Sequence, residues 1–318
     1  MFARSRHLAL CTLAVTFAGC GAAAPSSPAA PSTSAPAASA STAPTKLVVG
    51  LGQAVAQVSP LWVAQDAGFY TRNGLDIDAR VAVATTGLAA LLSGELTFHI
   101  GGGSEMLNGV ANGAELVALA NLAPKSALRF EAAASIKTKD DLIGKKLGIT
   151  RIGSATHTAS LTLLRKIGLD PDKDVSFVQL NTTSAVTTAL IAGAIQGAMC
   201  SLPECLKDEA AGLHPMYNLA QLNMLDTTAV VVAVKPWVTA HRDVTQRFID
   251  GLVEGVAREK KDKPLSTASL KKNMKIDDQA ALNGTYDFYV NNVLASEPYS
   301  RPEQFADVVT SITAQTGS

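Results

Sequence analysis

Residues 90–100 read ALLSGELTFHI, and residues 189–199 read ALIAGAIQGAM. Each stretch predicts the end of an apolar helix, a glycine that stops it, and a short buried strand. Gly94 and Gly193 follow the two helices, where a residue without a Cβ adopts the left-handed conformation at little cost. Two such units a domain apart predict two α/β lobes built alike, with a cleft between them that binds a small molecule.

The pattern continues outward from both units as strands that alternate with helices, which indicates an α/β fold with parallel pairing. Strands are expected at 47–49, 75–81, 97–101, 116–120, 147–149, 175–180, 198–199 and 230–234. Helices are expected from 59, at 86–93, from 105, at 153–167, 184–192 and 242–260, and over most of 277–312.

The N-terminus predicts export. Arg4 and Arg6 precede the apolar run 8–17, which is shorter than the roughly 20 residues that span a bilayer. This arrangement is typical of a secretory signal peptide, here residues 1–19. Phe17-Ala18-Gly19-Cys20 resembles a bacterial lipobox, in which the cysteine is acylated after cleavage. The alternative is a plain secretory signal with an incidental cysteine.

Residues 20–44 are rich in Ala, Pro and Ser and carry no charge. Such a segment buries too little apolar surface to offset the entropy of ordering, so we expect a disordered tether. With a lipid on Cys20, the globular part would be held at a bacterial membrane, in the periplasm or on the outer face of the cell membrane.

Composition and motifs exclude several functions. The 318 residues carry 27 basic and 27 acidic side chains and no basic stripe, which argues against nucleic acid as a partner. The sequence has no dinucleotide fingerprint, P-loop, HExxH or G-x-S-x-G motif. The five histidines are scattered. We therefore expect no enzyme activity, no cofactor and no metal.

A set of segments carries a family resemblance. These segments are PLWVAQDAGFY at 60–70, NGLDI at 73–77, LIGKKLGI at 142–149, GSATH at 153–157 and SEPYSRPE at 296–303. Their order and spacing resemble the solute-binding proteins of the nitrate/sulfonate/taurine ABC-importer group, which includes the related thiamine-pyrimidine-binding proteins. The resemblance covers roughly residues 46–310.

The resemblance implies a two-lobe type II periplasmic-binding-protein fold with a ligand cleft between the lobes. Residues 45–122 and 228–318 would form lobe 1, and residues 123–227 lobe 2, with crossings near 122–125 and 226–228. It also implies a small-molecule ligand, ABC permease subunits as partners, and a monomer. The family often has Asp where Thr97 and Gln196 stand, and an aromatic residue that the segment 201–204 lacks.

Three segments lead from strands to helix starts at the expected cleft: 54–59, 101–104 and 151–157. Helix starts offer free amides and a positive dipole end, which favour anions. The alternative for each serine and threonine is a simple helix cap. The predicted ligand-binding residues are Gln57, Ser59, Thr85, Thr86, Gly103, Ser104, Arg151, Gly153, Ser154, Thr156, His157 and Glu204.

Several of these residues have a second interpretation. Arg151 either pairs with a sulfonate or carboxylate or is a solvated arginine at a strand end. His157 either contacts ligand or caps and packs its helix, and Glu204 either meets a ligand amine or solvates a loop. Cys200 and Cys205 either form a disulfide or stay two separate thiols.

The sequence as a whole predicts a lipid-anchored solute-binding protein that delivers a small organic anion, such as a sulfonate, to an ABC importer. One alternative is a receptor for a thiamine pyrimidine or another heteroaromatic precursor. Another is a lipoprotein without a transport role that uses the fold for partner contacts. The related thiamine-pyrimidine synthases carry a cysteine-rich iron-binding run that is absent here.

Overall fold

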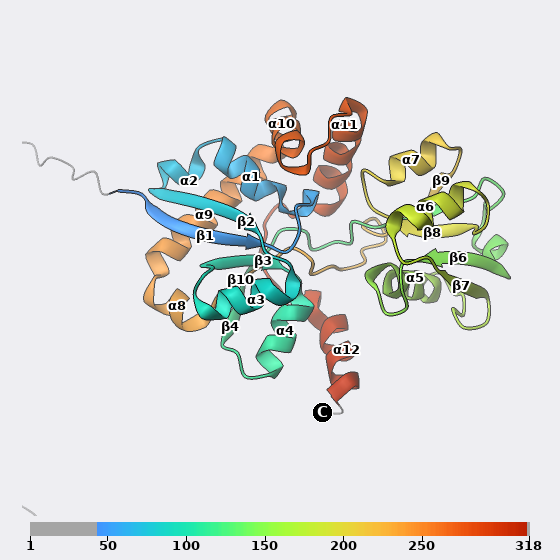
Figure 1. Cartoon of the computed structure of the whole chain (residues 1–318), viewed down its shortest axis with the longest axis horizontal. Helices are drawn as coiled ribbons and strands as arrows, with labels where there is room; N and C mark the ends of the chain where they lie inside the picture. Colours follow the sequence, from blue (N-terminus) through green and yellow to red (C-terminus); the bar gives the residue numbers. More distant parts are fainter. Residues whose placement is uncertain (1–42, 317–318) are drawn as a thin grey trace, which may run out of the picture. The chain divides into compact units, whose positions relative to one another are not determined.

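The computed structural model describes residues 43–316, so the predicted signal peptide, Cys20 and most of the tether lie outside the described residues. Within this range the chain forms two five-stranded sheets (Figure 1). The first has the order β2-β1-β3-β10-β4, and the second β7-β6-β8-β5-β9. The strands of the first are β1 Thr45–Leu51, β2 Leu75–Val81, β3 Phe98–Gly101, β4 Leu116–Asn121 and β10 Val230–Val234. Those of the second are β5 Arg129–Ala132, β6 Lys145–Ile149, β7 Val175–Gln179, β8 Gly197–Cys200 and β9 His214–Asn218.

Helices connect the strands and cover the sheets. The connecting helices are η1 Ala56–Val58, α1 Ser59–Asp66, α2 Phe69–Arg72, α3 Ala84–Ser93, α4 Gly103–Ala111, η2 Lys139–Leu142, α5 Ala155–Lys166, α6 Thr183–Ile191 and α7 Cys205–Ala210. The C-terminal part adds α8 Lys235–Ala240, α9 Arg242–Glu259, α10 Lys263–Met274, α11 Gln279–Phe288, the π-helical turn η3 Tyr289–Val293, η4 Pro302–Phe305 and α12 Ala306–Thr316.

The repeated sequence unit has the same structure in both sheets. Gly94 (φ 82°) follows α3, and Gly193 (φ 73°) follows α6, both in the left-handed conformation that favours glycine. In each unit the next strand, β3 or β8, takes the central position of its sheet. The predicted helix–glycine–strand repeat is therefore confirmed.

Strand pairing is only partly parallel. β1 pairs in parallel with β2 and β3, and β6 does so with β7 and β8. β10, however, runs antiparallel to β3 and β4, and β5 runs antiparallel to β8 and β9. The expectation of parallel pairing was wrong for these strands because β5 and β10 each follow a segment that arrives from the other sheet, not a β–α–β crossover.

Two antiparallel chain segments connect the sheets. The amide of Asp226 donates to the carbonyl of Pro124 over 3.0 Å, and Lys125 forms an isolated bridge with Leu225. The amide of Leu122 donates to the carbonyl of Ala229 over 3.0 Å. The lobe boundaries placed at 122–123 and 227–228 stay a prediction.

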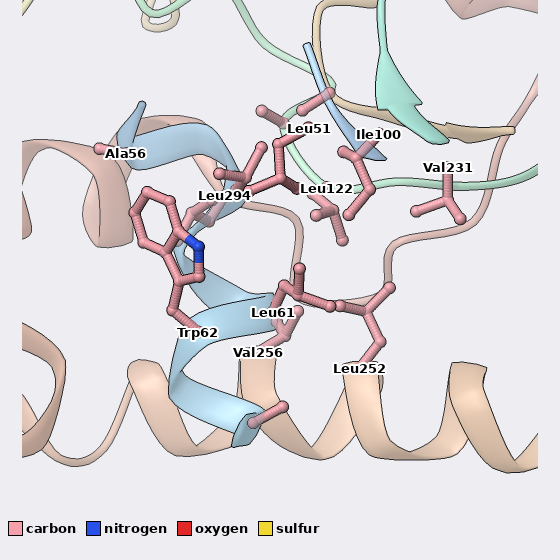
Figure 2. Packing of buried hydrophobic residues seen from close by; sticks show 14 of the residues in the cluster. Leu51, Ala56, Leu61, Trp62, Ile100, Leu122, Val231, Leu252, Val256 and Leu294 are labelled. Atoms are coloured by element: carbon pink, nitrogen blue, oxygen red, sulfur yellow. The ribbon is translucent and has the colours of Figure 1, made fainter. Parts of the chain in front are cut away.

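The largest core cluster joins the first sheet to the C-terminal helices. Leu61 of α1 points toward Leu252 of α9, whereas the ring of Trp62 extends away from α9 toward Ala56 (Figure 2), and all these side chains are buried. A Cβ on Gly255 would lie 2.3 Å from the carbonyl oxygen of Pro60. Glycine at this position therefore lets the two helices approach closely.

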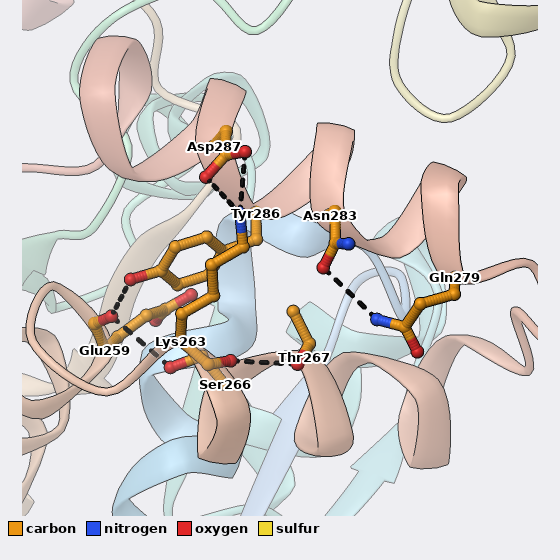
Figure 3. Close-up of polar contacts among 8 residues, drawn as sticks. All are labelled: Glu259, Lys263, Ser266, Thr267, Gln279, Asn283, Tyr286 and Asp287. Carbon is orange, nitrogen blue, oxygen red and sulfur yellow. Dashed lines mark hydrogen bonds and ion pairs between the residues drawn. The ribbon is translucent and has the colours of Figure 1, made fainter.

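Polar contacts join α9, α10 and α11 (Figure 3). The backbone carbonyl of Glu259 accepts hydrogen bonds from Tyr286 Oη (2.8 Å) and Ser266 Oγ (3.3 Å). Lys263 Nζ lies 2.7 Å from both carboxylate oxygens of Asp287. These contacts fix the C-terminal end of α9, where the buried side chain of Glu259 lies.

Candidate functional site

In open α/β sheets ligands bind beyond the carboxyl ends of the parallel strands. In the first sheet these ends lead into residues 52–58, 82–83 and 102, and in the second into 150–154, 180–182 and 201–204. Most of the predicted ligand residues lie in these loops or in the first turn of the helix that follows.

The second sheet presents a cluster of three hydroxyl groups after β6. Thr150 Oγ1 lies 2.9 Å from Ser154 Oγ and 3.0 Å from Thr156 Oγ1, and the latter two are 3.0 Å apart. Ser154 also caps α5 by accepting a hydrogen bond from the amide of His157. The structure thus brings Ser154 and Thr156 together, and it adds Thr150, which the sequence reasoning missed.

His157 has partners in the loop before α5 and in β7. Its Nδ1 accepts a hydrogen bond from the amide of Gly153 over 3.0 Å, and its ring meets the Phe177 ring edge-on at 5.0 Å. Gly153 has φ 79°, which a residue with a Cβ rarely adopts. These contacts fit the capping and packing interpretation of His157 and leave Nε2 as the ring's donor.

Arg151 is exposed beside the hydroxyl cluster. Within residues 43–316 its guanidinium makes no ion pair and no side-chain hydrogen bond. Its neighbour Ile152 is 76% exposed. The loop therefore offers one cation, one apolar side chain and the start of a 12-residue helix.

The first sheet places its predicted residues in different surroundings. Ser59 is fully buried, and its Oγ lies 2.6 Å from both the carbonyl oxygen of Ala56 and Glu259 Oε1, within hydrogen-bond distance of each. Because that hydroxyl is used inside the core, this structure gives no support to a ligand contact by Ser59. Gln57 is half-buried, with Oε1 lacking a hydrogen-bond partner among the described atoms.

The remaining predicted ligand residues on this sheet differ in burial and in hydrogen bonding. Gly103 is buried, its amide donates to the carbonyl of Thr227 over 2.7 Å, and a Cβ there would lie 2.7 Å from that of Thr227. Ser104 is exposed in the first turn of α4. Thr86 is exposed, and its Oγ1 donates to the carbonyl of Val83 over 3.0 Å. Thr85 lies in α3, with its side chain outside the described part.

In this structure Cys200 and Cys205 form a disulfide, with 5.5 Å between their Cα atoms. Glu204 is half-buried within the bridged segment. The carboxylate of Glu131 and the two sulfurs lie within 4.8 Å of one another. Since the sulfurs are joined to each other, they are not thiolate ligands for a metal.

A buried charged cluster near the disulfide was missed by the sequence reasoning. Arg129 Nη2 lies 2.5 Å from Oε1 of the fully buried Glu131, and it also pairs with Glu209. Burial raises the pKa of Glu131 to about 7, although Arg129 acts to lower it. Burial likewise raises the pKa of Asp208 to about 6. Since Arg129 is neutralised internally, it is a weaker candidate for an anion than Arg151.

Two cavities lie elsewhere on the described part. One of about 400 Å³ runs beside the edge strand β2, lined among others by Trp62, Asp66 and Lys272. The other, of about 280 Å³, lies where the chain crosses between the sheets. None of the predicted ligand residues lines either cavity.

Comparisons identify the fold. A family model described as NMT1/THI5 like matches residues 55–262. The periplasmic aliphatic sulphonate binding protein SsuA from Escherichia coli superposes with a TM-score of 0.70 and 20% identity, covering 86% of this chain and 88% of that one. The alkanesulfonate-binding protein SsuA from Xanthomonas axonopodis pv. citri, bound to MOPS, gives a TM-score of 0.62 and 19% identity, covering 86% and 94%.

An enzyme shares the same fold. A mutant of DszB, a desulfurization enzyme, in complex with biphenyl-2-sulfinic acid gives a TM-score of 0.64 and 16% identity, covering 86% of this chain and 92% of that one. No curated protein sequence matches the chain significantly. Among residues 43–316, no helix has the length and apolar character needed to cross a membrane. The predicted periplasmic-binding-protein fold is confirmed.

Proposed function

The chain belongs to the NMT1/THI5-like family, and on this basis we propose that it is an extracytoplasmic solute-binding lipoprotein. In this proposal it binds a small organic anion of the sulfonate class in a cleft between its lobes and delivers it to an ABC importer. Cys20 holds it at the membrane through a lipid, and residues 21–44 act as a tether.

The observation that carries this proposal is the loop after β6. There the hydroxyls of Thr150, Ser154 and Thr156 gather at the start of α5, beside the exposed Arg151. Hydroxyl donors, helix amides and a guanidinium together match the oxygens of a sulfonate or carboxylate. The exposed Ile152 next to them suits an apolar substituent on the same ligand.

Two points support binding without turnover. The cysteines of the described part are joined to each other, so neither is a free nucleophile. The proteins reported above as binding proteins for sulfonates share the fold over most of their length. Because an enzyme has the same fold, the absence of turnover has to be tested by direct measurement.

A thermal-shift screen tests the ligand class. Alkanesulfonates, taurine, nitrate, pyrimidines and flavins are compared on one protein preparation. The proposal expects a concentration-dependent rise in Tm with sulfonates, because a ligand that binds only the folded state stabilises it. Mass spectrometry of the recovered ligand is expected to show it unchanged. A rise with neutral heteroaromatics alone would favour the precursor receptor, and a chemically altered ligand would establish an enzyme.

A further inference from the structure

The cavity of about 280 Å³ is lined by two parts of the chain that are far apart in the sequence. It is lined by Pro124 and Lys125 of the crossing segment, by Lys260 just past α9, and by residues 290–296 of η3 and the segment that follows. It therefore joins one of the two segments that cross between the sheets to the C-terminal helices. None of the residues that line it is acidic.

Lys260 points its ammonium group at this cavity. Its Nζ donates to the carbonyl of Leu294 over 3.1 Å and to Ser296 Oγ over 3.2 Å, and both residues line the cavity. These acceptors are neutral, so they satisfy two of the three N–H groups without cancelling the charge. In the described part of the chain, Lys260 forms no ion pair.

The nearest carboxyl group does little to neutralise Lys260. Glu259 precedes it in the chain, but its Oε1 accepts a hydrogen bond from Ser59 inside the core. Burial raises the pKa of Glu259 to about 8, so this carboxyl is mostly uncharged at neutral pH. The pKa of Lys260 is lowered, chiefly by burial. Its charge is therefore partly removed from water and lacks a counter-ion.

Lys125, from the crossing segment, supplies a second cation to the lining of the cavity. It is half-buried, its backbone is fixed by the bridge to Leu225, and no ion pair involves it within residues 43–316. Ser296 Oγ accepts from Lys260 and keeps its own proton to donate. Two unpaired lysines and a hydroxyl donor around one hollow make an electropositive pocket.

We propose that this cavity is a second binding site, specific for a small inorganic oxyanion such as phosphate or sulfate, held between Lys125 and Lys260. A water molecule takes about 30 Å³ in the liquid, so about 280 Å³ accommodates a tetrahedral oxyanion with some of its waters. The site is distinct from the loop around Arg151 and does not depend on the proposed function. An anion bound in this cavity would stabilise the position of the crossing segment next to η3.

Isothermal titration calorimetry with inorganic phosphate and with sulfate, in buffer of low chloride, tests the proposal on the intact chain. Saturable binding with one site is expected. Lys260→Gln and Lys125→Gln should each weaken it at least tenfold, and Lys260→Arg should restore most of it because it keeps the cation. Lys261→Gln changes the exposed neighbouring lysine and should leave the affinity as it is.

Arg151→Ala separates this site from the proposed sulfonate site. Unchanged phosphate affinity in that variant is expected. Loss of phosphate binding in Arg151→Ala but not in the Lys125→Gln, Lys260→Gln double variant would overturn the proposal, as would the absence of saturable binding to the unmodified protein. Circular dichroism and Tm of each variant show whether a loss of binding comes from misfolding, and Lys260→Arg distinguishes a lost charge from a lost packing contact.

Discussion

Ser59 Oγ donates a hydrogen bond to Glu259 Oε1 over 2.6 Å and so joins the first turn of α1 to the last turn of α9. The two residues lie 200 positions apart in the sequence. Glu259 is 1% exposed, and its Oε2 has no hydrogen-bond partner among the described atoms. A carboxyl in this setting is favoured in its neutral form.

This pair predicts how stability depends on pH. Burial raises the pKa of Glu259 from 4.5 to about 8, so its contribution is fully present below the unfolded pKa and is lost as the pH rises through about 8. Glu259→Gln keeps an acceptor for Ser59 but cannot ionise. We expect it to be more stable than the unmodified protein at pH 9, by on the order of 5 kcal/mol, and similar at pH 4. Urea unfolding at pH 4 and at pH 9 measures the unfolding free energies. An equal loss of stability from pH 4 to pH 9 in the two proteins would contradict the prediction.

The close approach of α1 and α9 gives a second prediction. Gly255→Ala places a Cβ 2.3 Å from the backbone oxygen of Pro60, which cannot move without shifting α1. Despite the better helix propensity of alanine, we expect a loss of roughly 1–3 kcal/mol in unfolding free energy. Gly284→Ala is the matched control, since its Cβ meets only the flexible end of Leu206 at 3.2 Å. Equal stability of the two variants would show that α1 and α9 do not approach each other closely at Gly255.

The disulfide gives a third prediction. Reducing the Cys200–Cys205 bond, or replacing both residues by serine, should lower the unfolding free energy by about 2 kcal/mol, because a short loop is no longer closed in the unfolded chain. Thiol labelling with mass readout, before and after reduction, checks the bond directly. Labelling of both cysteines in the native, unreduced protein would rule the bridge out.

The fold was predictable from sequence where its signals are local. The glycines after α3 and α6, each between an apolar helix end and an apolar strand, predicted the two central strands at once. β5 was missed because Arg129 and Glu131 alternate with two apolar residues over only four positions, too short a run to show a period of two. Likewise α10, over 263–274, carries serines and lysines without an apolar stripe.

The candidate site was predictable in part for similar reasons. The sequence indicated Ser154 and Thr156 because a glycine and hydroxyl residues precede an apolar helix, whereas Thr150 stands at a strand end with no motif around it. The burial of Ser59 depends on Glu259, whose position in space no local pattern reveals. The charged cluster around Arg129 likewise depends on Glu209, 80 residues further along the chain.

Membrane attachment is the fourth prediction. Cys20→Ser should move the protein from the membrane fraction to the soluble fraction of the producing cells, because the proposed lipid would then be absent. Mass spectrometry of the mature N-terminus identifies the acyl chains in the unmodified protein. A mature protein whose Cys20 carries no acyl group would contradict lipidation.

The central claim is that this protein binds a small organic anion through the loop that contains Arg151, and calorimetry with an alkanesulfonate tests it most directly. Loss of a charge-assisted hydrogen bond costs roughly 1.5–3 kcal/mol, so Arg151→Ala should weaken binding by about tenfold or more. Arg165→Ala, at the exposed far end of the same helix, should bind as the unmodified protein does. The account predicts saturable sulfonate binding that only Arg151→Ala impairs. Sulfonate affinity that is equal in all three proteins would remove Arg151 from the site, and no sulfonate binding together with tight binding of a neutral heteroaromatic would contradict the account.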